Sequence, residues 1–219
     1  MTSPNFFGIT ELGLFCLAVL LLNVTPGPDT AYIAGRSLAQ GRRAGLISAA
    51  GISAGCCLHA VASALGLSAL LAASATAFLI VKLAGGMYLI YLGLCMLLPR
   101  SGQPTTDANA TPRALDQKPL PTIFMQALLT NLMNPKVILF FISFFPQFVA
   151  PDATHKTLTL LLLGAIFVVM STCWNCGTAL VVAVLVQRRI AGSAYQKWLG
   201  RIVGGSFIAL GARLLMTRD

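Results

Sequence analysis

The feature that most constrains this chain is a series of long apolar runs that are almost free of charge. Residues 44–99 contain a single charged side chain, Lys82, and residues 158–186 contain none. Because a membrane-spanning helix needs about 20 consecutive apolar residues, the first run is long enough for two spans and the second for one. Only 10% of all residues are charged, against about 25% in a soluble domain. The sequence therefore predicts an integral membrane protein that crosses the bilayer several times.

Six spans can be placed along the chain. One is expected at residues 12–28, two within 44–99 joined by a turn at 72–77, and one each at 120–149, 158–186 and 198–216. The last contains Arg201 and Arg213, so five spans is the alternative. We predict an all-α polytopic fold in a single transmembrane domain, 1–219, made of two three-helix repeats at about 1–99 and 120–219. Because three helices precede the polar linker at about 100–119, the second repeat enters the membrane in the opposite sense and is inverted.

Basic residues collect on one side of this predicted topology. Ten of the 15 Lys and Arg residues lie in the loop after the first span, the central linker and the loop after the fifth span. Positive loops mark the cytoplasmic side, which puts both termini outside the cytoplasm if there are six spans. The net charge of +9 therefore indicates contact with anionic membrane lipids; the basic residues form no stripe of the kind that binds nucleic acid. The first apolar segment has no basic region before it, so we expect it to be retained rather than cleaved.

The first span ends in an irregular sequence that contains Asn23, Thr25 and then Pro26, Gly27, Pro28 and Asp29. The two prolines donate no backbone hydrogen bonds and the glycine frees the local dihedral angles, so the helix is predicted to break. Inside a membrane, such a break is tolerated only where protein or a water-filled cavity satisfies the freed backbone groups. The alternative is that the break ends an ordinary helix at the membrane interface.

A second break is predicted at the corresponding place of the second repeat. Asn131, Asn134, Pro135 and Lys136 interrupt the fourth apolar run, about half a chain length after Pro26. Two proline-interrupted segments in matching positions of two halves are the sequence sign of a transporter's central site. We therefore expect these two segments to form one site. The three asparagines would satisfy backbone groups that the breaks expose.

Three charged residues lie within the predicted spans. A charged side chain at bilayer depth costs roughly 2.5–3.5 kcal/mol on insertion scales, so Asp29, Lys136 and, as a further possibility, Lys82 are expected to face the protein interior or a wet cavity. Alternatively, Asp29 lies at the interface beside Arg36, and Lys82 extends its long side chain to the headgroups.

The two broken segments resemble those of the LysE/RhtB-type family, the lysine exporters and homoserine-threonine resistance proteins. The resemblance rests on the run from Thr25 to Asp29 near the end of the first span and on Asn134-Pro135-Lys136 in the fourth, and it covers nearly the whole chain. It implies an exporter of amino acids or close derivatives in the bacterial inner membrane, exchanging them for protons. The family's substrates are diverse, so the resemblance does not name this one.

A mechanism can be built from the residues beside that resemblance. A half-helix that starts after Pro28 would present unpaired N–H groups and a positive dipole end to a carboxylate. Asp29 would receive the substrate's ammonium or hold a proton in its absence, since burial favours the neutral form of an acid. Lys136 would pair with Asp29 or with the substrate's carboxylate.

Other motifs in the sequence point to other classes of function, but more weakly than the two breaks point to a transporter. Cys173 and Cys176 form a Cys-x-x-Cys sequence, which would suit a membrane thiol oxidoreductase, and efflux of another small solute is a further alternative. No grouping of His, Cys and carboxylates has metal-ligand spacing, and no nucleotide-binding loop occurs, so we expect a secondary transporter without metal or cofactor rather than an enzyme. Glycines four residues apart, such as Gly51 with Gly55 and Gly200 with Gly204, predict close helix contacts or a homodimer interface.

Overall fold

The computed structural model describes residues 8–73, 117–150 and 152–188, together with the single positions Thr76, Ile80, Leu83, Met87, Ile90, Tyr91 and Leu94. Within these residues the fold is a bundle of helices, and the regular elements contain no strand. Two of these helices are long and apolar enough to cross a membrane, and a bent pair makes a third candidate. The predicted all-α membrane fold is confirmed to this extent. Lys82, the central linker and the sixth span lie outside the described residues.

The described chain begins with two helical segments in series. Helix α1 (Leu12–Val24) is about 20 Å long at 1.5 Å per residue, which is too short to cross a bilayer alone. After a three-residue break, α2 (Pro28–Ala73) begins, and its first part continues to Gln40. The prediction that Arg36 lies in a loop is therefore wrong, because the chain resumes a helix directly after the break. The predicted break after the first apolar helix is present at residues 25–27.

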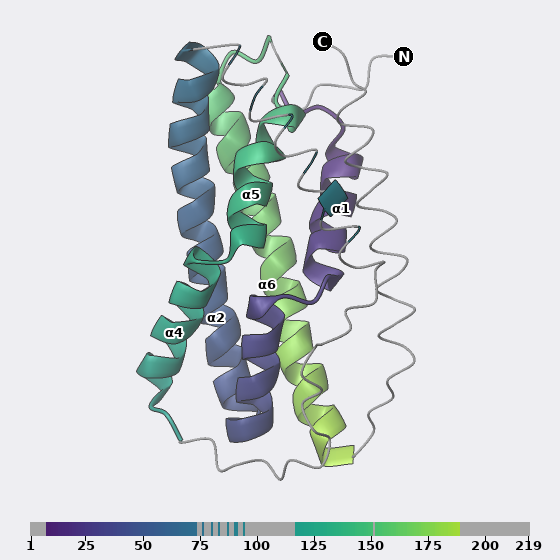
Figure 1. The fold of residues 1–219 in the computed structure, drawn as a ribbon, viewed down its shortest axis with the longest axis vertical. Helices are drawn as coiled ribbons and strands as arrows, with labels where there is room; N and C mark the ends of the chain where they lie inside the picture. The colour runs from purple at the N-terminus through teal and green to yellow at the C-terminus, as the bar shows by residue number, and fades with distance from the viewer. Residues whose placement is uncertain are drawn as a thin grey trace.

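Helix α2 reverses direction at Gly41, whose φ of 77° and ψ of −172° are not helical. Only glycine adopts this conformation without strain. The two parts then pack closely, since a Cβ built on Gly45 would lie 2.0 Å from the Oγ of Ser37. In Figure 1 the first part descends from the middle of the bundle and the second rises along its whole height.

The second half contains a matching broken crossing. Helix α4 (Leu120–Leu132) and helix α5 (Pro135–Ser143) are bent by 49° across a two-residue break. They rise through the bundle, whereas α1 and the first part of α2 descend through it (Figure 1). The two broken crossings therefore run in opposite directions, as an inverted repeat requires.

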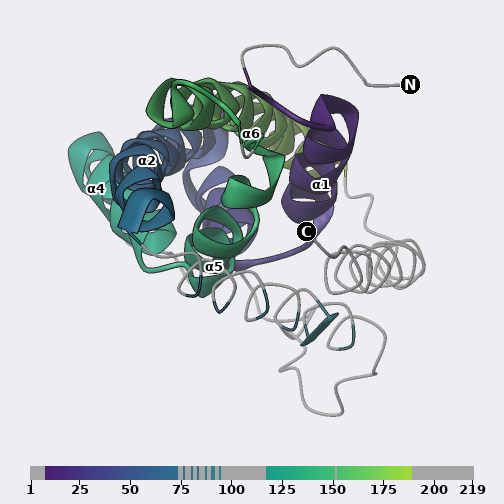
Figure 2. The same ribbon diagram turned by 90° about the horizontal axis from the view of Figure 1, so that it is seen from above.

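A long helix, α6 (Lys156–Arg188), completes the described bundle and packs mainly on α2. Seen end-on in Figure 2, α5 lies between α2 and α1, and α6 runs along one side of all three. Between α5 and α6 the chain forms the 3₁₀ helix η1 (Phe145–Phe148). An isolated antiparallel bridge between Ile9 and Val149 then ties the start of the described chain to this connection.

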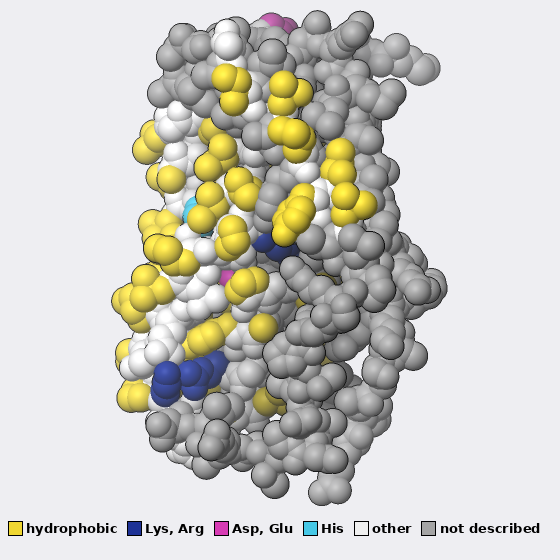
Figure 3. Space-filling model, in the orientation of Figure 1, with side chains coloured by type: hydrophobic (Ala, Val, Ile, Leu, Met, Phe, Trp, Pro, Cys, Tyr) yellow, Lys and Arg dark blue, Asp and Glu magenta, His cyan; other side chains and the backbone are white. Residues whose placement is uncertain are grey.

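The side chains divide as expected for a protein in lipid. Figure 3 shows hydrophobic side chains over the described outer surface and a group of Lys and Arg at its lower end. The core holds a cluster of seven aromatic rings in mutual contact, at Phe15, Phe140, Phe141, Phe144, Phe145, Phe148 and Phe167. These rings come from α1, α5, η1 and α6 and fill the upper half of the bundle.

Candidate functional site

The two helix breaks meet inside the bundle. Each second half-helix begins with a proline followed by a charged residue, Pro28-Asp29 in α2 and Pro135-Lys136 in α5. A proline suits the first position of a helix because its missing N–H would have no partner there. From the sequence, Pro135 was expected to be the equivalent of Pro26 in the other repeat. The helix boundaries show that its equivalent is Pro28, because both prolines are the first residue of a helix. With that match, the two breaks present charges of opposite sign at equivalent positions.

Asp29 is held by the opposite half of the protein. Its Oδ2 accepts a hydrogen bond of 2.7 Å from the Nδ2 of Asn131, a fully buried residue at the end of α4. Its Oδ1 is also buried but has no hydrogen-bond partner among the residues that the structure describes. Asp29 is thus not a surface partner of Arg36, whose guanidinium donates to Gln40 and Gln126. One carboxylate oxygen is fixed and the other is free to bind a further donor.

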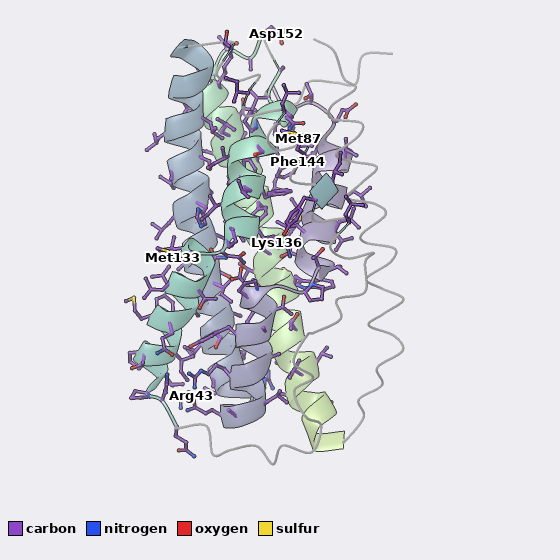
Figure 4. The ribbon with its side chains drawn as sticks, viewed as in Figure 1. Arg43, Met87, Met133, Lys136, Phe144 and Asp152 are labelled. Carbon is purple, nitrogen blue, oxygen red and sulfur yellow. The ribbon has the colours of Figure 1, made fainter. Side chains whose placement is uncertain are left out.

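Lys136 reaches across to the end of α1, at mid-height in the bundle (Figure 4). Its ammonium donates to the backbone oxygens of Leu22 and, at 2.8 Å, Thr25. The last carbonyl groups of a helix lack partners within that helix, so a cation from elsewhere can cap them. The expected alternative, a direct ion pair with Asp29, is not formed in this structure. Each break is therefore stabilised by a polar side chain from the other half.

The N-termini of the two half-helices differ in one respect. At α5, the side-chain oxygen of Asn134 accepts from the N–H of Lys136 at 3.1 Å and so caps the helix. At α2, the equivalent residue is Gly27, which has no side chain. The N–H of Ala31 donates to Gly27 O at 2.9 Å, whereas those of Asp29 and Thr30 have no acceptor within the described chain. The start of α2 is thus an open site for an anion.

A small cavity of about 30 Å³ lies between the breaks and α6. This volume suits one or two water molecules and is too small for an amino acid. Its wall combines the polar groups just described with apolar side chains. The lining residues are Leu22, Asn23, Gly27, Asp29, Thr30, Ile52, Cys56, Asn134, Lys136, Val137, Phe167, Ser171 and Asn175. The polar groups from both breaks therefore face one small space.

The remaining residues expected at the site have structural contacts. Thr25 is buried and its hydroxyl donates to Leu21 O at 2.7 Å, while Pro26 is exposed. Asn23 donates to Val19 O and to Ser171 Oγ, at 2.9 and 3.1 Å. Of the three asparagines expected to satisfy backbone groups exposed by the breaks, Asn134 caps such a group. Asn23 donates to a carbonyl inside α1 and to Ser171, and Asn131 donates to the side chain of Asp29.

Sequence reasoning missed the contribution of α6. Ser171 and Asn175 are 1% and 5% exposed and line the cavity. They are four residues apart, so they lie on one face of the helix. A signal was present, because polar residues at this spacing in an uncharged membrane helix are expected to face the protein interior.

The cysteine motif does not line this site. Cys173 and Cys176 lie within α6, and Cys173 is exposed on the outer surface. Neither lines the cavity. Among the residues that the structure describes, the cysteines are free thiols. This placement favours a packing role for the pair over redox chemistry.

Comparisons with known proteins identify relatives over almost the whole chain. The family model for the LysE type translocator matches residues 20–218. An uncharacterized membrane protein of Pseudomonas aeruginosa is 33% identical over 205 residues, which cover 94% of this chain and 91% of that protein. Leucine efflux proteins of Salmonella typhimurium and Salmonella typhi are each 26% identical over 211 residues, or 95% of this chain and 96% of theirs. No solved structure matches the chain.

Proposed function

This chain belongs to the LysE type translocator family, and we propose that it exports apolar amino acids such as leucine across the bacterial inner membrane in exchange for protons. An amino-acid exporter is the function that the family and the leucine efflux relatives support. The observation that carries the proposal is the free Oδ1 of Asp29 beside the cavity, opposite Lys136 and the open start of α2. These groups offer both signs of charge that a zwitterion needs.

The substrate's two charged groups would bind different polar groups of the site. Its carboxylate would bind the N–H groups of Asp29 and Thr30, with the ammonium of Lys136 nearby. Its own ammonium would bind Asp29 Oδ1. The apolar side chains of Ile52, Val137 and Phe167 would surround an aliphatic side chain. Because the cavity holds only about 30 Å³, the two halves must separate before a substrate enters.

Proton coupling would follow from competition at a single acid. A proton neutralises Asp29 when no ammonium is present, and an ammonium neutralises it when no proton is bound. The empty ionised site is costly at this depth, so the protein would change conformation with one or the other bound. Export of an amino acid would then return a proton to the cytoplasm.

We further propose the complete architecture of six spans in two inverted repeats. The opposite directions of the two broken crossings support it. Membrane lipids would contact the exposed apolar surface. The homodimer predicted from Gly200 and Gly204 concerns residues outside the described part and stays a prediction, whereas Gly51 and Gly55 face α4 of the same chain.

Efflux from proteoliposomes loaded with labelled leucine tests this function. An acidic exterior should accelerate efflux, and an uncoupler should remove the acceleration. A panel of labelled amino acids run in parallel would rank the substrates. Efflux no faster than from protein-free liposomes, for every amino acid tested, would contradict the proposal.

A further inference from the structure

Asn175 is a buried polar residue to which the structure gives no partner. It lies on α6, is 5% exposed and lines the cavity between the breaks. Its side-chain amide makes no hydrogen bond within the described residues. An asparagine amide can donate twice and accept twice, so the described part of the chain uses none of this capacity.

The other asparagines at the site differ from it in this respect. Asn23 donates to Val19 and Ser171, Asn131 donates to Asp29, and Asn134 accepts from Lys136 N. Each of these amides holds the protein together across or beside a break. Asn175 makes no such hydrogen bond within the described residues, although it borders the same cavity. Structural stabilisation therefore does not account for it.

Burying such a group in a membrane helix has a cost. An amide whose hydrogen bonds are supplied neither by protein nor by water costs roughly 1–3 kcal/mol, and at Asn175 only the contents of the cavity can supply them. Since the amide faces the cavity, a molecule that enters can supply the missing partners. A group of this kind in a transport protein is therefore expected to bind the cargo.

The charged groups already placed indicate which end of the cargo needs it. A carboxylate is served by two free N–H groups at the start of α2 and by Lys136. An ammonium has three N–H donors. Three buried side-chain oxygens have no hydrogen-bond partner in the described residues, those of Asp29 (Oδ1), Ser37 and Asn131, and only Asp29 lines the cavity. Removing it from water requires further acceptors. We infer that the side-chain oxygen of Asn175 binds the substrate's α-ammonium together with Asp29, which extends the proposed function and rests on it.

Kinetics of efflux from proteoliposomes test this assignment. Asn175→Leu removes the amide and keeps the shape, and it should raise the KM for leucine about tenfold or more, the usual effect of losing a hydrogen bond to a charged group. Thr178→Val is the matched control on α6, because its hydroxyl bonds only Trp174 O of the same helix; its KM should equal that of wild type. If Asn175→Leu does not reach the membrane, Asn175→Ala is measured instead with the same expectation.

Two leucine analogues separate the ends of the cargo. Leucinamide keeps the ammonium without a carboxylate, and 2-hydroxyisocaproate keeps the carboxylate without an ammonium. In Asn175→Leu, inhibition of efflux by leucinamide should weaken about as much as leucine binding, and inhibition by the hydroxy acid should not change. The reverse pattern, or an unchanged KM for leucine, would overturn the assignment. Wild-type protein that exports no amino acid would instead contradict the proposed function itself.

Discussion

Asn131 and Asp29, which are 102 residues apart, are joined by a hydrogen bond of 2.7 Å between the amide nitrogen and one carboxylate oxygen. The bond links the end of α4 to the start of α2 and thus joins the two halves at their breaks. It also fixes the orientation of the acid, so that its second oxygen is left for a ligand or a proton. Any movement that separates the halves must break this bond or carry both residues together.

The role of Asp29 in coupling can be tested by Asp29→Asn. The variant keeps an oxygen that can accept from Asn131, so it should insert and fold as wild type does. It cannot exchange a proton, so leucine efflux should no longer respond to an imposed pH gradient. Flux measured at several external pH values checks this. An undiminished response to the gradient would remove Asp29 from the coupling mechanism.

Lys136 should matter for stability as well as for transport. Lys136→Met leaves the backbone oxygens of Leu22 and Thr25 without their donor, and each buried unsatisfied carbonyl costs about 1–3 kcal/mol. The thermal unfolding midpoint of the purified protein in detergent should therefore fall. Lys136→Arg, which keeps a cationic donor, should lose less. Equal midpoints for wild type and Lys136→Met would show that this cap contributes little.

Two glycines of α2 provide a matched pair for testing the packing around the site. A Cβ on Gly55 would lie 2.5 Å from Asn131 Oδ1, whereas a Cβ on Gly66 would meet no atom within 4 Å. Gly55→Ala should displace Asn131 and slow leucine efflux severalfold. Gly66→Ala should leave efflux at the wild-type rate. If both variants transport equally well, the close approach of α2 to α4 is not needed for function.

The cysteine pair separates transport from redox function. Because Cys173 is exposed and neither thiol lines the cavity, the double variant Cys173→Ala with Cys176→Ala should export leucine at the wild-type rate. Both proteins should also react slowly with a thiol-alkylating reagent, as ordinary thiols do. Loss of efflux in the double variant, or one rapidly alkylated thiol in wild type, would revive the oxidoreductase alternative.

The sequence predicted the position of the first helix break more accurately than the extent of the helix that follows it. Two prolines and a glycine predict a break at residues 26–28 from local chemistry alone, and the cost of a charge in lipid predicts that Asp29 faces the protein interior. The loop predicted at Arg36 was wrong because Asp29 and Arg36 interrupt the apolar run, although both lie in α2. Their partners, Asn131 and Gln126, lie about 90 to 100 residues away, and a reading of local hydrophobicity has no access to such contacts.

The same limit applies to α6. Its composition predicts a span, and the structure confirms one, but which face meets the cavity depends on how α6 packs against α2 and α1. Ser171 and Asn175 therefore became site residues only when the helices were assembled. The loop predicted between the first two spans is confined to a reversal at Gly41, since the residues on both sides of this glycine are helical and composition alone does not show how short a turn can be.

Gln126 is the basis of a last prediction, about how the site opens. Its side-chain oxygen accepts hydrogen bonds from Tyr32, Arg36 and Lys118, each at 3.2 Å, and so ties the first part of α2 to α4 at the basic end of the bundle. The other end is filled by aromatic rings. Polar contacts that water can replace are easier to open than a packed apolar cluster, so we expect the basic end to open more readily.

Removing this acceptor should favour the state open toward the basic end. In a protein whose native cysteines are replaced by alanine, Ser37→Cys places a thiol at a position that is only 2% exposed, between the two parts of α2. Adding Gln126→Leu should speed its reaction with a membrane-impermeant maleimide supplied from the basic side several-fold. Leu38→Cys, at an exposed position beside it, is the control and should react at the same rate with or without Gln126→Leu. If the rate at position 37 does not change either, the Gln126 contacts do not hold the closed state.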